Sequence, residues 1–134
     1  MTILDFFIKW NNVGCDFDGY YGNQCMDLYR QYVKDVINCP QSPGVGGAKD
    51  VWTTYLKKYF VRVSNSPVNF PKKGDIVIWG TGAGPYGHIA ICMDANVNNF
   101  ISFDQNWPLG SISHFQTHNY TNVLGWLSPI TKII

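Results

Sequence analysis

One cysteine stands where a helix is expected to begin. Cys25 lies in the sequence Gly-Asn-Gln-Cys-Met-Asp-Leu, residues 22–28, directly before the apolar pattern of a predicted helix. The free N–H groups and the positive dipole end at a helix N-terminus both favour thiolate over thiol. The position therefore suits a nucleophile, although a cysteine near a helix is more often a small buried apolar residue.

One histidine is placed to act with this thiol. His88 follows a glycine-rich turn, residues 80–87, and opens the strand-like sequence His-Ile-Ala-Ile-Cys, where an imidazole can face an open cleft. A Cys–His pair is the minimal unit for nucleophilic acyl chemistry, because the imidazole takes the thiol proton and later protonates the leaving amine. His114 and His118 lie in a polar stretch without a neighbouring acid or thiol, and we expect them to be solvated.

The pair needs a third group to orient the imidazole, and the sequence offers two. Asp104 and Asn106 end the next strand-like segment, two residues apart and therefore on one face. Either side chain could accept the Nδ1–H of His88. The order along the chain is then cysteine, histidine, and an acid or an amide.

The loop before the predicted nucleophile has the spacing of a calcium site. Its acids fall at relative positions 1, 3 and 12, with backbone carbonyls at 5 and 7, as in an EF-hand loop. The predicted ligands are Asp16, Asp18, Tyr20, Gly22 and Asp27. Tyr21 stands where the EF-hand has Gly, and position 12 is Asp instead of Glu. An ordinary Asp-Gly turn is the alternative; a bound Ca²⁺ would be structural and would order the helix start.

Helices are predicted in the first half of the chain. Thr2 can cap a helix with Ile3, Phe6, Phe7 and Trp10 on one face, which ends at residues 11–14. The strongest helical pattern runs over residues 24–36. A further helix is predicted over residues 48–58.

The second half changes to short β-branched or aromatic runs separated by Gly, Pro and Asn. The predicted strands are residues 60–63, 75–79, 88–94, 99–103 and 123–127. Helices followed by strands indicate an α+β domain in which N-terminal helices pack on a small curled antiparallel sheet.

Composition limits the class of protein. At 134 residues with 46% hydrophobic and 14% charged residues, the chain is expected to form one domain, residues 1–134, with a real core. A net charge of +1 disfavours a nucleic-acid partner or an anionic membrane surface, and no apolar stretch reaches the ~20 residues of a membrane span. Residues 1–10 lack the basic n-region of a signal peptide.

The roles of the remaining cysteines and of the aromatic residues are predicted from their positions in the sequence. Cys15, Cys39 and Cys92 have no regular spacing and are predicted to be free thiols without a catalytic role. Aromatic residues make up 16% of the chain. Trp79, Tyr86 and Trp107 fall beside the catalytic segments and are predicted to line a substrate groove.

Three motifs in order resemble one known family. Gln-Cys-Met-Asp-Leu at 24–28, Gly-His-Ile-Ala at 87–90 and Asp-Gln-Asn-Trp at 104–107 resemble the cysteine, histidine-dependent amidohydrolase/peptidase (CHAP) domain of phage peptidoglycan hydrolases, over essentially the whole chain. The resemblance implies a papain-like α+β fold with Cys25 as nucleophile and His88 as base. It places the family's acid, usually Glu, at Asp104 and its orienting amide at Asn106. Gln24 would then help to hold the oxyanion.

The resemblance also implies the substrate, bacterial peptidoglycan, with an amide bond as the target. We expect an endopeptidase that cleaves between D-Ala and a cross-bridge residue, with N-acetylmuramoyl-L-alanine amidase as the alternative. A non-catalytic, calcium-dependent wall-binding module and an intracellular cysteine protease are further alternatives. Only some family members bind calcium through such a loop, and no organic cofactor is needed.

The expected setting follows from the same resemblance. The enzyme would wait in the host cytoplasm until a holin opens the membrane, or would be carried on a virion tail. We expect a monomer, with any separate cell-wall-binding module in a longer chain or in a partner protein.

Overall fold

The computed structural model describes residues 1–131. Helix α1 (Ile3–Trp10) begins where the sequence predicts it, because the Thr2 hydroxyl accepts the Asp5 N–H at 3.0 Å. Its buried face carries Ile3, Phe6 and Phe7. The first predicted helix is therefore confirmed in both its start and its apolar face.

The second helix carries the predicted nucleophile at its first position. Helix α2 (Cys25–Tyr32) continues directly into one π-helical segment, η1 (Val33–Ile37), and the left-handed residue Asn38, with φ 59°, ends the run. This agrees with the prediction over residues 24–36, except that the last turn is wider than an α-helix.

The third predicted helix is much shorter than residues 48–58. A 3₁₀ turn, η2 (Ala48–Asp50), leads into α3 (Val51–Thr54), after which the backbone is extended at Tyr55. The Arg62 guanidinium donates to the Trp52 carbonyl at 2.8 Å and lies over the Trp52 and Tyr55 rings. This contact with the sheet replaces the helical turn that the apolar spacing alone suggested.

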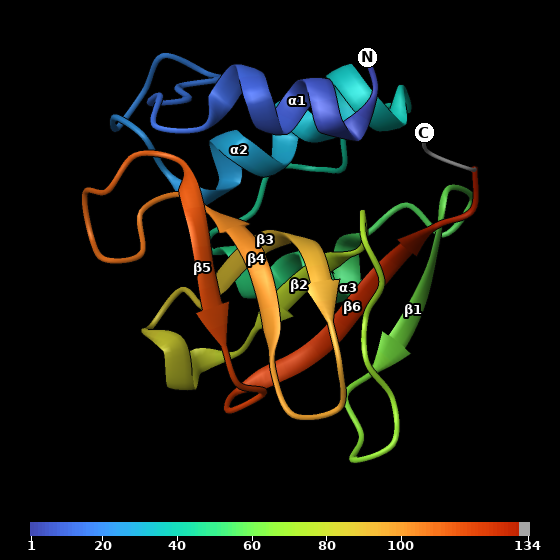
Figure 1. Cartoon of the computed structure of the whole chain (residues 1–134). Helices are drawn as coiled ribbons and strands as arrows, with labels where there is room; N and C mark the ends of the chain where they lie inside the picture. Colours follow the sequence, from blue (N-terminus) through green and yellow to red (C-terminus); the bar gives the residue numbers. More distant parts are fainter. Residues whose placement is uncertain (132–134) are drawn as a thin grey trace.

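Within residues 1–131, six antiparallel strands form one sheet in the order β1-β6-β2-β3-β4-β5, and Figure 1 shows α1 and α2 together on one side of it. The strands are β1 (Phe60–Ser64), β2 (Ile76–Trp79), β3 (His88–Ala95), β4 (Phe100–Asp104), β5 (His114–His118) and β6 (Val123–Pro129). A short 3₁₀ turn, η3 (Thr81–Ala83), joins β2 to β3. The five predicted strands are confirmed, but the edge strand β5 was not predicted.

Alternate residues of the central strand β2 belong to two separate apolar clusters. Ile76 and Ile78 pack with the buried residues of α1, α2 and η1, whereas Val77 and Trp79 belong to a second cluster on the other face. Because both faces are buried, all four residues are apolar and the strand shows no polar alternation.

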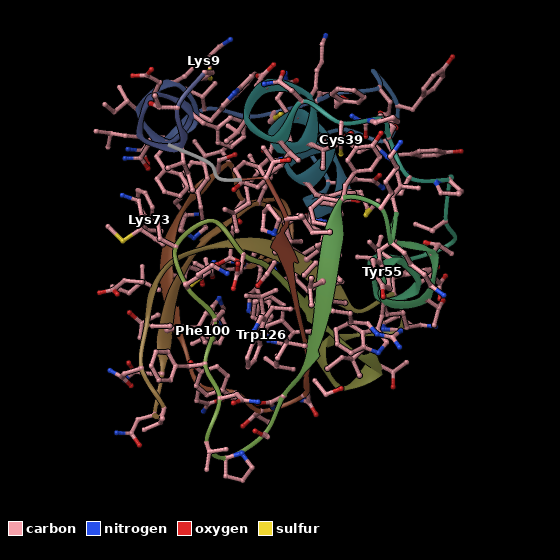
Figure 2. The ribbon with its side chains drawn as sticks, turned by 90° about the vertical axis from the view of Figure 1, so that its right-hand side faces the viewer. Lys9, Cys39, Tyr55, Lys73, Phe100 and Trp126 are labelled. Atoms are coloured by element: carbon pink, nitrogen blue, oxygen red, sulfur yellow. The ribbon has the colours of Figure 1, made fainter. Side chains whose placement is uncertain are left out.

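The face of the sheet that carries the second cluster also carries the catalytic candidates. Phe100 and Trp126 lie inside the curl of the sheet, as Figure 2 shows. Trp79 pairs with His88 across β2 and β3, so the two side chains share this face. Asp104 lies on it as well, because it alternates in step with Phe100 along β4.

No helix within residues 1–131 is long and apolar enough to cross a membrane. The α-helices α1 and α2 each have eight residues, against the ~20 that a span requires.

Substitution of Phe103 tests how much the packing of the helices on the sheet contributes to stability. Its fully buried ring meets the edges of Phe6 and Phe7, at centroid distances of 6.3 and 5.1 Å. We expect Phe103→Ala to lower the free energy of unfolding by about 3–5 kcal/mol, because a large cavity remains in the core. Urea denaturation measures this. Phe70, which is 49% exposed, is the matched control: Phe70→Ala should change stability by less than about 0.5 kcal/mol.

Candidate active site

Cys25 and His88 open onto the same cleft. The cleft has a volume of about 610 Å³ and lies between the start of α2, the turn before β3 and the loop after β4. Its walls are formed by Tyr21, Gln24, Cys25, Met26, Val45, Gly46, Gly47, Ala48, Ala83, Gly84, Pro85, Tyr86, Gly87, His88, Asn106, Trp107 and Leu109. None of these is Asp, Glu, Lys or Arg, so the thiol and the imidazole are the chemically reactive groups that face it.

The turn before His88 needs glycine at its last position. Gly87 has φ 70°, and a Cβ there would clash with the Trp79 carbonyl oxygen. A side chain would therefore be strained twice, by the backbone conformation and by the contact. Glycine lets the turn approach β2 closely and delivers His88 to the floor of the cleft.

Asp104, not Asn106, is the partner of His88. The Asp104 carboxylate is fully buried, and its Oδ1 lies 2.7 Å from His88 Nε2. Asn106 lines the cleft but has a left-handed backbone, φ 67°, and its Oδ1 accepts the Gly110 N–H at 2.6 Å. The two residues that the sequence left as alternatives thus have different roles, and Asn106 shapes the loop.

The imidazole is turned the other way from the expected orientation. The sequence suggested that the third group would accept Nδ1–H, whereas Asp104 accepts from Nε2 of His88. Nδ1 is thereby left without a bond to Asp104, on the ring of a histidine that shares the cleft with the Cys25 thiol. A carboxylate that only accepts keeps the proton on Nε2, so Nδ1 is the nitrogen that can exchange a proton with sulfur.

The buried His88–Asp104 pair favours the charged forms of both groups. Burial opposes protonation of His88, but hydrogen bonds to Asp104 and Cys25 outweigh it and raise the pKa of His88 to about 9. Burial alone would raise the pKa of Asp104, yet hydrogen bonds from His118 and His88 lower it to about 2. Each partner therefore stabilises the charge of the other over the whole neutral range.

Two of the three predicted groove aromatics line the cleft, and one does not. Tyr86 and Trp107 are among the wall residues. Trp79 is only 1% exposed and packs against the His88 ring at a centroid distance of 5.0 Å. It was predicted to be in the groove because it is near the catalytic segment in sequence, but its place in β2 points it into the inner cluster.

Gln24, the predicted oxyanion residue, lies in the wall of the cleft next to Cys25 in sequence. Its backbone N–H is already used, because it donates to the Asp27 carboxylate at 2.9 Å. The donors that remain for an oxyanion at this point are the Gln24 side-chain amide and the Cys25 N–H, which has no acceptor within the helix.

Sequence reasoning missed Gln105, which joins the two halves of the site. Its side chain is fully buried, and its Nε2 donates to the carbonyls of Cys15 and Gln24 at 2.6 and 2.8 Å. Its Oε1 accepts the Cys15 N–H at 2.7 Å and the Ser113 hydroxyl at 3.0 Å. The residue next to Asp104 is thus bonded to the residue before Cys25, and this fixes the nucleophile relative to the acid.

His118 was expected to be solvated, and this prediction is wrong. Its side chain is 9% exposed, and its Nε2 lies 2.9 Å from Asp104 Oδ2. It belongs to β5, the strand that was not predicted, where it pairs with Phe100 of β4. His114 differs, because it is half-buried and bonds through Nδ1 to the Ile112 carbonyl.

The three predicted acidic ligands lie together. One carboxylate oxygen from each of Asp16, Asp18 and Asp27 falls within 4.8 Å of the others. Burial and the nearby charges of Asp18 and Asp16 raise the pKa of Asp27. Within residues 1–131 no lysine or arginine forms an ion pair with any of the three. The cluster is therefore a set of hard oxygen donors with uncompensated negative charge, which fits a divalent cation.

The other thiols are free and lie outside the cleft. Burial raises the pKa of Cys15 and of Cys92 to about 12, and it also raises the pKa of Cys39. None of the three lines the cleft. The prediction that Cys15, Cys39 and Cys92 are unpaired thiols is therefore confirmed, and their lack of a catalytic role stays a prediction.

The fold and the site define an α+β domain with a cysteine at a helix start, a histidine at a strand start and a buried acid behind it. The chain belongs to the CHAP domain family, which matches residues 15–106. Cys25, His88 and Asp104 all fall inside that range. The α+β CHAP fold that the sequence motifs indicated is thus confirmed.

Individual relatives include two phage proteins. The chain is 34% identical to endolysin PlyTW of Staphylococcus phage Twort (strain DSM 17442 / HER 48) over 128 residues, 88% of this chain and 27% of that protein. It is 36% identical to endolysin LysK of Staphylococcus phage K over 94 residues, 69% of this chain and 19% of that protein. The chain thus spans about a quarter of the length of these curated relatives, or less.

A solved structure shows the same architecture. The crystal structure of the wild-type endolysin LysIME-EF1 superposes with a TM-score of 0.78 at 30% sequence identity. The match covers 94% of this chain and 62% of that one. The arrangement of α1, α2 and the curled sheet is therefore shared with an endolysin.

The pKa of His88 makes the stability of the fold depend on pH. Because its folded value, about 9, exceeds the ~6.5 of an unfolded chain, stabilisation by the imidazolium is complete below about pH 6.5 and is lost as pH rises through 9. We expect the free energy of unfolding from urea titrations to fall over this window. Asp104→Asn should show a smaller fall.

The matched control for that experiment is Asn106→Gly, which keeps the left-handed backbone and leaves the His88–Asp104 pair intact. It should retain the pH dependence of the wild type. Equal slopes in the wild type and in Asp104→Asn would contradict the assignment of Asp104 as the partner.

Proposed function

We propose that this domain hydrolyses an amide bond in bacterial peptidoglycan by Cys–His nucleophilic catalysis. The observation that carries the proposal is the placement of Cys25 and His88 in one cleft without charged wall residues, with Asp104 buried behind the imidazole. Two curated relatives and a solved structural neighbour are named endolysins, which supports the cell wall as the substrate.

In the first step the Cys25 sulfur attacks the carbonyl carbon of the amide. Nδ1 of His88 holds the proton that the thiol has given up, a C–S bond forms between the thiolate sulfur and the carbonyl carbon, and the carbonyl π pair moves onto oxygen. In this proposal the Cys25 N–H and the Gln24 side-chain amide donate to this oxyanion. The Asp104 carboxylate holds the imidazolium through Nε2 and does not itself need to take a proton.

The tetrahedral species then collapses, and His88 completes the proton transfers. The C–N bond breaks as Nδ1 protonates the departing amine, which leaves a thioester on Cys25. His88 next removes a proton from water, the hydroxide attacks the thioester, and the carboxylic acid is released as the thiol is restored. No organic cofactor enters these steps.

Within this reaction class we propose an endopeptidase that cuts between D-Ala and a cross-bridge residue. The glycines in the cleft walls, Gly46, Gly47 and Gly87, and the absence of Asp, Glu, Lys and Arg from those walls support a small, uncharged peptide segment as the substrate. At Gly47 a Cβ would lie 2.8 Å from the Tyr86 carbonyl oxygen, so even an alanine there would disturb the wall. The longer relatives support a separate wall-binding module in the full protein and action at the wall after release from the host cytoplasm.

Removing the nucleophile should abolish hydrolysis without loss of the fold. We expect Cys25→Ala to reduce turbidity clearing of purified cell walls by about 10⁴-fold or more, because the covalent route is lost. Cys39→Ala is the matched control, since Cys39 lies outside the cleft, and it should keep wild-type activity. A Cys25→Ala protein that still clears walls would refute the mechanism.

Mass spectrometry of the same digests identifies the bond. New amino termini on cross-bridge residues are expected for the endopeptidase, whereas freed L-Ala termini would identify an N-acetylmuramoyl-L-alanine amidase instead.

We also propose that the Asp16–Asp18–Asp27 cluster binds a structural Ca²⁺. The three carboxylates would be ligands, and the carbonyls of Tyr20 and Gly22 would complete the set. A bound Ca²⁺ would neutralise the repulsion among the acids. Asp27 belongs to the first turn of α2 and its Oδ2 accepts the Gln24 N–H, so ordering this loop also orders the start of the nucleophile helix.

Calcium should stabilise the domain. At a concentration about 100 times the dissociation constant, Ca²⁺ contributes about 2.7 kcal/mol, so addition of EGTA should lower the melting temperature measured by calorimetry. Asp18→Asn should lose this response. Asp94→Asn, which removes an exposed acid from β3, should keep it. If the melting temperature, the activity and the calcium content of the wild type are all unchanged by EGTA, the loop is only a turn.

A further inference from the structure

Three hydrogen-bond donors converge on the buried Asp104 carboxylate, and only one of them is His88. Oδ1 is 2.7 Å from His88 Nε2. Oδ2 accepts the Ser102 hydroxyl at 2.5 Å and lies 2.9 Å from His118 Nε2. Because a carboxylate only accepts, the Nε2 of His118 must carry its proton here. His118 is thus a donor to the oxygen that His88 does not use.

The pair of donors on Oδ2 determines which oxygen is left for His88. A carboxylate held at one oxygen alone can rotate about its Cβ–Cγ bond, and a terminal sp³–sp² torsion of this kind is soft. Ser102 and His118 come from neighbouring strands, β4 and β5, and meet Oδ2 together. Two donors from two strands fix the plane of the carboxylate, and Oδ1 is then directed at His88.

The His118 ring is held in place by its neighbours. Its centroid lies 4.7 Å from that of Trp107, 5.0 Å from that of Trp79 and 5.6 Å from that of Phe100. Trp107 and Trp79 also pack against the ring of His88, at 4.9 and 5.0 Å. The two histidines therefore lie on opposite oxygens of one carboxylate within a single aromatic enclosure.

His118 does not reach the substrate. It is absent from the walls of the cleft, while His88 is part of them. Any effect of His118 on the reaction must therefore pass through Asp104 or through the packing of the aromatic enclosure. These two routes differ in what they require of residue 118, namely an N–H donor or a ring.

We propose that His118 is a positioning residue of the Cys–His reaction, which holds Oδ2 of Asp104 through its Nε2–H so that Oδ1 orients His88. The proposal rests on the proposed amide hydrolysis. It gives the edge strand β5 a part in catalysis. Three neighbouring strands, β3, β4 and β5, then contribute side chains to the site.

Two substitutions separate the donor from the ring. His118→Gln keeps an N–H at the position of Nε2 but loses the aromatic ring, whereas His118→Phe keeps the ring and loses the donor. We expect His118→Phe to lower kcat for wall hydrolysis about tenfold, as for the loss of a hydrogen bond to a charged group, with KM nearly unchanged. His118→Gln should retain most of the wild-type kcat. If His118 acted through the packing of its ring alone, His118→Phe would instead keep more of the wild-type kcat than His118→Gln.

A double-mutant cycle tests the route through Asp104. If His118 acts only on that carboxylate, adding His118→Phe to Asp104→Asn should lower kcat little further. His114→Phe, on the same strand, is the matched control and should match the wild type. Near-ultraviolet circular dichroism and melting temperature report whether each variant is folded.

If His118→Phe does not fold, Ser102→Ala removes the other donor to Oδ2 with a smaller change in volume, and it too should lower kcat with KM unchanged. Wild-type kcat in both His118→Phe and Ser102→Ala, or fully additive effects in the cycle, would overturn the proposal. A wild-type protein that does not hydrolyse walls would instead refute the proposed function, so the two failures are distinguishable.

Discussion

The structure depends on the burial of one negative charge. A carboxylate removed from water, as that of Asp104 is, costs several kcal/mol unless donors replace the water. Here the donors come from three strands, so β3, β4 and β5 must be in register for the charge to be tolerated. The aromatic side chains around it exclude water and strengthen the remaining interactions. The stability of this corner of the sheet and the orientation of the imidazole therefore have the same origin.

Much of the site could be predicted from sequence because its parts begin regular elements. Cys25 opens a helix and His88 opens a strand after a glycine turn, and both positions can be read from local patterns. The choice between Asp104 and Asn106 could not, because spacing alone puts both on one face. The left-handed backbone at Asn106, which turns that side chain toward Gly110, is determined by the loop after β4.

Sequence reasoning missed strand β5, in which polar residues face the interior. Strand β5 has the sequence His-Phe-Gln-Thr-His, and the sequence predicts solvated histidines there because the stretch is polar and contains no neighbouring acid or thiol. The inner face of this sheet contains a charge, so a histidine there is stabilised. The shortened third helix has a similar cause, since Arg62 of β1 binds the Trp52 carbonyl from outside the segment. In both cases the deciding partner is remote in sequence, and local periodicity carries no information about it.

The four hydrogen bonds of Gln105 determine when the site can assemble during synthesis of the chain. They connect it to Cys15, 90 positions earlier, and to Gln24, 81 positions earlier. Contacts of such separation form late, because a long loop must close before they contribute. During synthesis the nucleophile leaves the ribosome long before the residues that hold it in place. Cys25 therefore has no aligned partner for the proposed reaction until nearly the whole domain has been made, and an incomplete chain carries an unassembled site.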